Sequence, residues 1–250
     1  MTTLTSTPSL SAVVGLTRGL VFACTLIAGA ACSGQTQSGA AGGQPTTQAV
    51  TPPVVAASVA AVASAPPSVA TRKWNFDGDQ VGGLPSSAQP FSGEWAVRAE
   101  PDAPSPPNAL CQTGNADFPA IGLDDKPYTD LTIVAHFKPI SGKTDQAGGL
   151  IFRVQDKGNY YILRGNALED NVIFFTYVNA QRSQLKGANA KVTPNTWHEL
   201  RVEVRGNRFV GSLDGKQVVD STDSRYTAGG IGLWTKSDSV TCFDDVEVTA

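Results

Sequence analysis

The sequence predicts an all-β fold, an antiparallel jelly-roll sandwich of two sheets, over residues 72–250. Short runs that are apolar throughout, or that alternate apolar and polar residues, follow one another in this region, and Gly, Asp and Asn turn signals separate them. These runs leave no stretch with the long amphipathic periodicity that crossover helices between parallel strands would need. Two antiparallel sheets packed face to face are the simplest fold that fits both observations.

The composition divides the chain into two parts. Apart from Arg18, every charged residue lies at or beyond Arg72. Residues 32–71 are rich in Ala, Ser, Thr, Gly and Pro, a composition that buries too little apolar surface to offset chain entropy. Residues 72–250 contain all four Trp and are numerous enough to build one core. We therefore expect a disordered tether over 32–71 and a single folded domain over 72–250.

The N-terminal part has the features of an export signal. Arg18 precedes an apolar run over 19–31, which is too short to cross a bilayer as a helix but suits a signal peptide. Small residues before Cys32 resemble a lipobox, which predicts a signal peptide over 1–31, lipidation of Cys32 and a location in the periplasm or at the outer membrane. Membrane contact would then be made only through the lipid. The alternative is ordinary cleavage after Ala30, which would release the protein.

The predicted domain contains two cysteines, because Cys24 lies in the predicted signal peptide and Cys32 is the predicted lipidation site. An exported chain passes through an oxidising compartment, so Cys111 and Cys242 are expected to form a disulfide that closes a loop of about 130 residues. The alternative is two buried, reduced thiols.

The central strands are predicted over 131–137, 149–155, 160–164 and 171–178. The first of these includes His136, which we expect in the core. The second alternates Leu150, Phe152 and Val154 with more polar neighbours. The runs over 160–164 and 171–178 are apolar on both faces, as is typical of strands covered on both sides.

The C-terminal strands are predicted over 197–205, 208–213, 216–219, 230–236 and 239–248. In the first of them, His198 and Leu200 belong to the apolar phase that faces the core, whereas Glu199 and Glu203 alternate with it and should form solvated ion pairs with neighbouring arginines. Asp214 and Gly215 are a type I′ hairpin signal between the second and third of these strands.

Several segments together resemble a known superfamily. They are 146–153, 159–161, 164–171, 197–200, 213–215 and 232–246, the last containing Gly-Leu-Trp-Thr-Lys and Phe-Asp-Asp-Val. They resemble the concanavalin A-like lectin/glucanase superfamily, and within it the laminin-G-like jelly rolls akin to the 3-keto-disaccharide hydrolase domain. The resemblance implies an envelope-tethered domain that binds carbohydrate. It leaves two alternatives open, an enzyme of the 3-keto-glycoside hydrolase or lyase type and a structural envelope module.

Established catalytic patterns are missing from the sequence. A retaining glucanase of this superfamily would carry Glu-x-Asp-x-x-Glu to place two carboxylates about 5 Å apart, and that pattern does not occur. Neither a Gly-x-Ser-x-Gly elbow nor a His-Glu-x-x-His pair is present. If the domain is nevertheless an enzyme, the candidate bases are Asp156, Glu169 and Asp238.

The candidate ligand-binding residues are polar side chains and one aromatic residue on the central strands. They are Arg153, Gln155, Tyr161, Arg164, Asn171, Trp234, Lys236 and Asp238. Sugar recognition needs this mixture of a flat aromatic ring and side chains that hydrogen-bond hydroxyls. The alternative is that the two arginines pair with neighbouring carboxylates to hold the sheet together while the tryptophan is part of the core.

A calcium site is a further candidate. Asp77 and Asp79 lie near the first strand, Asp244 and Asp245 lie in the last, and hard oxygen ligands from both could hold one Ca²⁺. The alternative is ordinary turn chemistry of Asp. No other cofactor is expected. Subtracting Arg18 from 19 basic residues leaves 18 against 22 acidic ones in the domain, a balance that argues against nucleic acid as a partner.

Overall fold

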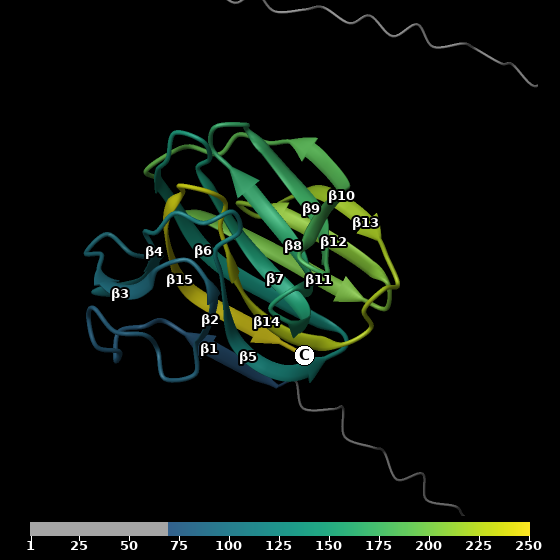
Figure 1. The fold of residues 1–250 in the computed structure, drawn as a ribbon, viewed down its shortest axis with the longest axis horizontal. Helices are drawn as coiled ribbons and strands as arrows, with labels where there is room; N and C mark the ends of the chain where they lie inside the picture. Colours follow the sequence, from purple (N-terminus) through teal and green to yellow (C-terminus); the bar gives the residue numbers. More distant parts are fainter. Residues whose placement is uncertain (1–69) are drawn as a thin grey trace, which may run out of the picture. The chain divides into compact units, whose positions relative to one another are not determined.

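A computed structural model describes residues 70–250, which form two antiparallel sheets packed face to face (Figure 1). The predicted signal peptide, the lipidation site Cys32 and residues 32–69 of the predicted tether lie outside the described residues. Among residues 70–250, no helix is long and apolar enough to span a bilayer.

The eight-stranded sheet runs in the order β13-β12-β11-β6-β15-β4-β3. β4 pairs with residues 241–243 of β15, and β1 pairs with residues 246–249 of the same strand. Its strands are β1 (Thr71–Trp74), β3 (Trp95–Ala99), β4 (Asn108–Gln112), β6 (Leu131–Ser141), β11 (His198–Arg205), β12 (Arg208–Leu213), β13 (Lys216–Thr222) and β15 (Val240–Thr249). The first and last strands of the domain are thus neighbours.

The seven-stranded sheet runs in the order β10-β9-β8-β7-β14-β5-β2, with its strands labelled in Figure 1. Its strands are β2 (Gln89–Ser92), β5 (Ala120–Tyr128), β7 (Ala147–Asp156), β8 (Asn159–Asn166), β9 (Asn171–Val178), β10 (Gln181–Asn189) and β14 (Gly229–Trp234). Every pairing in both sheets is antiparallel, which confirms the predicted fold class.

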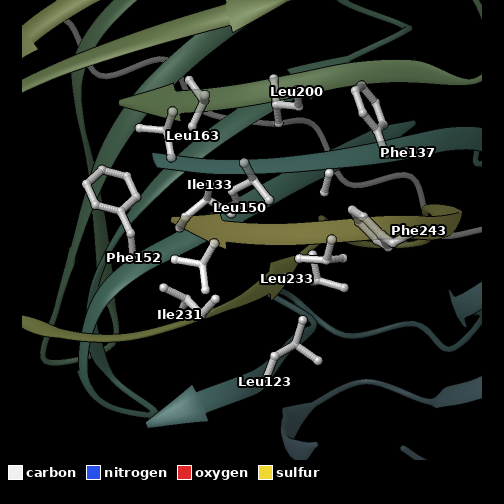
Figure 2. Packing of buried hydrophobic residues seen from close by; sticks show 14 of the residues in the cluster. Leu123, Ile133, Phe137, Leu150, Phe152, Leu163, Leu200, Ile231, Leu233 and Phe243 are labelled. Carbon is white, nitrogen blue, oxygen red and sulfur yellow. The ribbon is translucent and has the colours of Figure 1, made fainter. Parts of the chain in front are cut away.

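The core lies between the sheets and is built from alternate residues of the strands (Figure 2). Leu150 of β7, Leu163 of β8 and Leu233 of β14 point from the seven-stranded sheet toward Phe137 and Phe243 of the other. All five are fully buried, and removing such apolar surface from water is the main stabilising contribution to the fold.

The disulfide is present. Cys111 of β4 and Cys242 of β15 are directly paired across the two strands with their Cα atoms 4.0 Å apart, and their sulfurs are bonded. The bridge therefore fastens two neighbouring strands of the eight-stranded sheet that are 131 residues apart in the chain.

The two histidines differ in their environments. His198 is buried as predicted, with Nδ1 2.7 Å from an Asp214 carboxylate oxygen and Nε2 accepting from the amide of Thr193 at 2.9 Å. The prediction for His136 is wrong, because it alternates with the core residues of β6 and lies half-buried on the outer face of its sheet. Of the predicted ion pairs on β11, one forms between Arg201 and Glu203 at 2.8 Å.

Candidate functional site

The outer face of the seven-stranded sheet carries a second apolar cluster, on the side away from the core. Its buried members are Ala120, Ile151, Tyr160, Ile162, Ile173, Phe175, Tyr177 and Trp234, and Phe91, Phe118 and Val154 pack against them. They occupy the strand positions that alternate with the core residues. This is why β8 and β9 are apolar on both faces.

Trp234 lies under a second aromatic ring. It is 0% exposed, because Phe118 from the β4–β5 connection stacks on it with ring centroids 6.0 Å apart and an angle of 21° between the rings. Tyr177 contacts Phe118 edge-on at 5.4 Å. The predicted aromatic residue Trp234 thus belongs to this face, but the half-buried ring above it is Phe118, which no pattern in the sequence indicated.

Arg164 of β8 is held at this face by polar neighbours. Its Nη2 donates to Glu169 Oε2 at 2.7 Å and to Asn171 Oδ1 at 2.6 Å, and Asn171 in turn donates to Glu169 at 3.0 Å. Burial acts to raise the pKa of Glu169, but the hydrogen bonds from Asn171 and Arg164 outweigh it and hold that pKa below its ordinary value. The Nε of Arg164 is buried without a partner.

Asp145 and Lys236 complete the polar part of the face. Asp145 is 6% exposed, accepts from Asn166 Nδ2 at 2.7 Å and lies 3.7 Å from the Lys236 ammonium. The loop that carries it is fixed by Asp238, whose carboxylate accepts the backbone N–H groups of residues 143–145 at 2.7 to 3.1 Å. The Lys143 amide is the largest cause of the lowered pKa of Asp238. Asp238 therefore positions the loop.

Arg182 of β10 extends over the aromatic side chains from the edge of the sheet. Its guanidinium carbon lies 4.4 Å from the ring centroid of Phe175, 5.2 Å from that of Phe118 and 5.6 Å from that of Trp234. Burial and the nearby Arg164 lower the pKa of Arg182. Sequence reasoning missed this residue because β10 is a polar edge strand without an apolar pattern.

We refer to these residues together as the arginine cluster. Its members are Phe118, Asp145, Arg164, Glu169, Asn171, Arg182, Trp234 and Lys236. Four of the predicted ligand-binding residues are therefore brought together here, namely Arg164, Asn171, Trp234 and Lys236.

Three other predicted residues lie elsewhere. Arg153 has a φ of 49° at a bulge of β7 and is 2% exposed, and its guanidinium donates to three backbone carbonyls, those of Thr129, Gly206 and Tyr226. Tyr161 faces the core, and its hydroxyl donates to Asp223 at 2.5 Å. Arg153 and Tyr161 thus make structural hydrogen bonds. The predicted alternative, in which both arginines pair with carboxylates, describes Arg164 with Glu169 but not Arg153.

A groove of about 760 Å³ lies toward the other end of β7 and β14, where Phe91 and Val154 of the outer apolar cluster contribute to its lining. Its lining includes Phe91, Asp124, Asp125, Val154, Gln155, Asp156 and Gly230. Gln155, the third predicted residue outside the cluster, donates to the carbonyl of Ala228 at 2.5 Å. Asp156 accepts from the amide of Gly158 at 2.7 Å in the β7–β8 turn, so it lies apart from Glu169.

The structure does not support the calcium prediction. Within residues 70–250, the one group of three side chains with metal-ligand spacing is Glu100 with Cys111 and Cys242, whose sulfurs form the disulfide. Asp77 and Asp244 instead accept hydrogen bonds from Ser105, through its hydroxyl at 3.1 Å and its amide at 2.7 Å. Asp79 and Asp245 do not complete a set of three with them.

Comparisons with known proteins give one family match and several relatives. A family model described as a 3-keto-alpha-glucoside-1,2-lyase-like domain matches residues 112–249. A levanase of Bacillus subtilis (strain 168) is 30% identical over 121 residues, which are 48% of this chain and 18% of the levanase. The chain therefore matches less than a fifth of the length of that relative.

Among solved structures, carbohydrate binding module CBM66 from Bacillus subtilis superposes with a TM-score of 0.54 at 26% identity, covering 64% of this chain and 94% of the module. The GH43 BlXynB protein from Bacillus licheniformis superposes with a TM-score of 0.51 over 71% of this chain and 39% of its own, at 12% identity. At that identity the second similarity concerns the fold alone.

Proposed function

The chain belongs to the family of 3-keto-alpha-glucoside-1,2-lyase-like domains, and we propose that within this family it acts as a carbohydrate-binding domain. The similarity to CBM66 supports this assignment, because it extends over nearly all of that module at 26% identity. The matched part of the levanase is likewise a small fraction of that protein, as expected of an accessory module.

The arginine cluster is the observation that carries the proposal. A sugar ring presents an apolar C–H face and a rim of hydroxyls, so it needs a flat aromatic ring next to donors and acceptors. Phe118 supplies the ring, while Arg164, Asn171 and Lys236 supply hydrogen-bonding groups within the same face. The groove of about 760 Å³ toward the other end of β7 and β14 offers room for further sugar units of a chain.

Binding accounts for the cluster better than catalysis does. A general base works best with a pKa near the operating pH, whereas Glu169 has its pKa lowered by Asn171 and Arg164 and is a weak proton acceptor. The other candidate bases, Asp156 and Asp238, hold backbone amides of a turn and a loop.

We propose that the domain works outside the cytoplasm, joined to the envelope through a lipid on Cys32 and a tether over 32–71. The disulfide between Cys111 and Cys242 supports export, because such bonds persist in oxidising compartments.

Binding of the purified full-length chain to immobilised polysaccharides, levan among them, tests the proposal. We expect at least one to bind, and Phe118→Ala to weaken its affinity about tenfold, as truncation of an aromatic anchor commonly does. Val81→Ala, at an exposed apolar residue elsewhere in the domain, is the control and should bind like the wild type. Absence of binding to every polysaccharide, with turnover of a 3-keto-glycoside instead, would make the domain an enzyme.

A further inference from the structure

Arg182 is a charged side chain without a charged partner. Within residues 70–250 its guanidinium makes neither an ion pair nor a hydrogen bond, and its Nη1 is buried with no partner. Three aromatic rings hold it in place on one side of the sheet. Leaving a cation partly desolvated and unpaired is costly, so an anion that reaches it would be bound with a gain.

The carboxylates of the arginine cluster are already occupied by other groups. Glu169 pairs with Arg164 at 2.7 Å, and Asp145 lies 2.7 Å from Asn166 and 3.7 Å from Lys236. The arginine cluster as defined thus contains three cations, Arg164, Arg182 and Lys236, and two anions, an excess of one positive charge. Asp238, just outside the cluster, is directed to the backbone amides of residues 143–145. A second donor, the Nε of Arg164, is also buried without an acceptor.

The excess charge and the unsatisfied donors are on the side of the sheet that carries Phe118. The ammonium of Lys236 and the guanidinium of Arg182 each lie 5.2 Å from the centroid of that one ring. A sugar placed against Phe118 would therefore have cations next to it. Burial and the charge of Arg164 lower the pKa of Arg182, and the carboxylates of Asp145 and Glu169 offset only part of that effect.

We infer that the arginine cluster recognises an acidic sugar, whose carboxylate or sulfate group is bound by Arg182. The inference rests on the proposed function and specifies its ligand class. A planar guanidinium can give two parallel N–H···O bonds to such a group, and these charge-assisted bonds are stronger than bonds to a neutral hydroxyl. A hydroxyl could satisfy a donor of Arg182, but it would leave the charge unpaired.

Matched charged and neutral glycans test the inference on the purified full-length chain. The probes are oligogalacturonates, their methyl esters, dextran sulfate, dextran and levan, with affinities measured by titration calorimetry. We expect a charged glycan to bind about tenfold or more tightly than its neutral counterpart, in line with the strength of charge-assisted bonds. Preference for oligogalacturonates would assign a carboxylate, and preference for dextran sulfate would assign a sulfate.

Two variants make the test specific to Arg182. Arg182→Gln should erase the preference, and Arg182→Lys, which keeps the charge but loses the planar fork, should retain part of it. Lys186→Gln is the matched control, because it removes one charge from the same strand at a position paired with the core residue Phe174, and hence on the other face. Melting temperatures close to that of the wild type would show that the variants fold.

Equal affinity for the charged and neutral forms, or an Arg182→Gln variant that keeps the preference, would overturn the inference. Binding to dextran or levan alone would do the same while leaving the proposed carbohydrate-binding function intact. Loss of binding to all five glycans would overturn both.

Discussion

Two arginines on neighbouring strands show how a local backbone feature decides the role of a side chain. Arg164 follows the regular alternation of β8 and reaches the outer face, whereas Arg153 sits at a bulge that shifts the register of β7 between Phe152 and Asp156. A bulge re-aims a side chain, and here it directs the guanidinium to carbonyls at the ends of three loops. Counting alternate residues could not reveal this, because the bulge residue is not a glycine.

Asp244 of β15 is a buried carboxyl with an unpartnered Oδ1. Burial is the main cause that raises its pKa to about 6, and repulsion from Asp245 and Asp77 raises it further. Hydrogen bonds from the backbone amides of Ser105 and Asp245 lower the pKa and offset part of this rise. An acid whose pKa is higher in the folded state binds its proton more tightly there. Its contribution to stability is therefore full below about pH 4 and is lost as the pH rises through about 6.

We predict that Asp244→Asn removes this pH dependence. When the pH falls from 7 to 4.5, the free energy of unfolding of the wild type should rise by roughly 2 kcal/mol more than that of the variant, since each pKa unit corresponds to about 1.36 kcal/mol. Urea unfolding of both proteins at the two pH values measures the difference. A free energy that changes equally in both would show that Asp244 titrates normally.

At the scale of the elements, the runs predicted after residue 130 are strands because their signals are local. β6 to β9 and β11 to β15 each combine alternating or continuous apolar residues with Gly, Asp or Asn turns. β10 is the strand in this region that the sequence did not predict. It lies at the edge of its sheet and buries little, so its sequence lacks an apolar pattern.

The candidate site was harder to predict than the fold because it depends on contacts between distant segments. Phe118 and Trp234 meet only because β5 and β14 pair, and Arg182 joins them from the far edge of the same sheet. Residue type was enough to nominate Arg164, Asn171 and Lys236, whose strands or loops carry them to this face. Nothing in the local sequence around Phe118 or Arg182 marks them as neighbours.

The pairing of β4 with β15 leads to a prediction about the disulfide. Replacing Cys111 and Cys242 with Ser frees a loop of 131 residues in the unfolded chain, which should lower the free energy of unfolding by about 3 kcal/mol and the melting temperature by about 10 °C. Circular dichroism melts of the variant and of the wild type with and without reductant measure this. Glycan binding should persist, because the bridge belongs to the sheet opposite the arginine cluster. Identical melting curves for the variant and the wild type would mean that the disulfide adds no stability.

At the scale of the whole molecule, β1 connects the start of the domain to both sheets. It pairs with the end of β15 through four residue pairs, and the N–H and C=O of Ala70 bond those of Ala250. From the same strand, Arg72 reaches across to Asp124 of the seven-stranded sheet at 2.5 Å, and Trp74 packs against the core. β1 is therefore an integral strand of the described domain.

We predict that the chain can be shortened up to β1 but not through it. A chain that starts at Ala63 should melt at the temperature of the full chain, because it keeps β1 and every contact that β1 makes. A chain that starts at Asn75 loses the backbone bonds to β15 and the partly buried Trp74, and burying one large apolar side chain is worth about 1.5–3 kcal/mol. At this domain size the melting temperature should fall by roughly 5–10 °C.

The ion pairs of β1 can be separated from its backbone and packing contributions. Replacing both Arg72 and Lys73 with Gln removes the pairs with Asp124 and Glu247 but leaves the strand in place. The Lys73–Glu247 pair is exposed and contributes at most about 1 kcal/mol. Asp124, whose side chain is 4% exposed, keeps the hydrogen bonds from the Tyr128 hydroxyl and the Lys126 amide when Arg72 is replaced. This variant should therefore melt closer to the full chain than the chain starting at Asn75 does. If the Asn75 chain melted like the full chain, β1 would be an accessory strand, and the domain boundary would lie beyond Trp74.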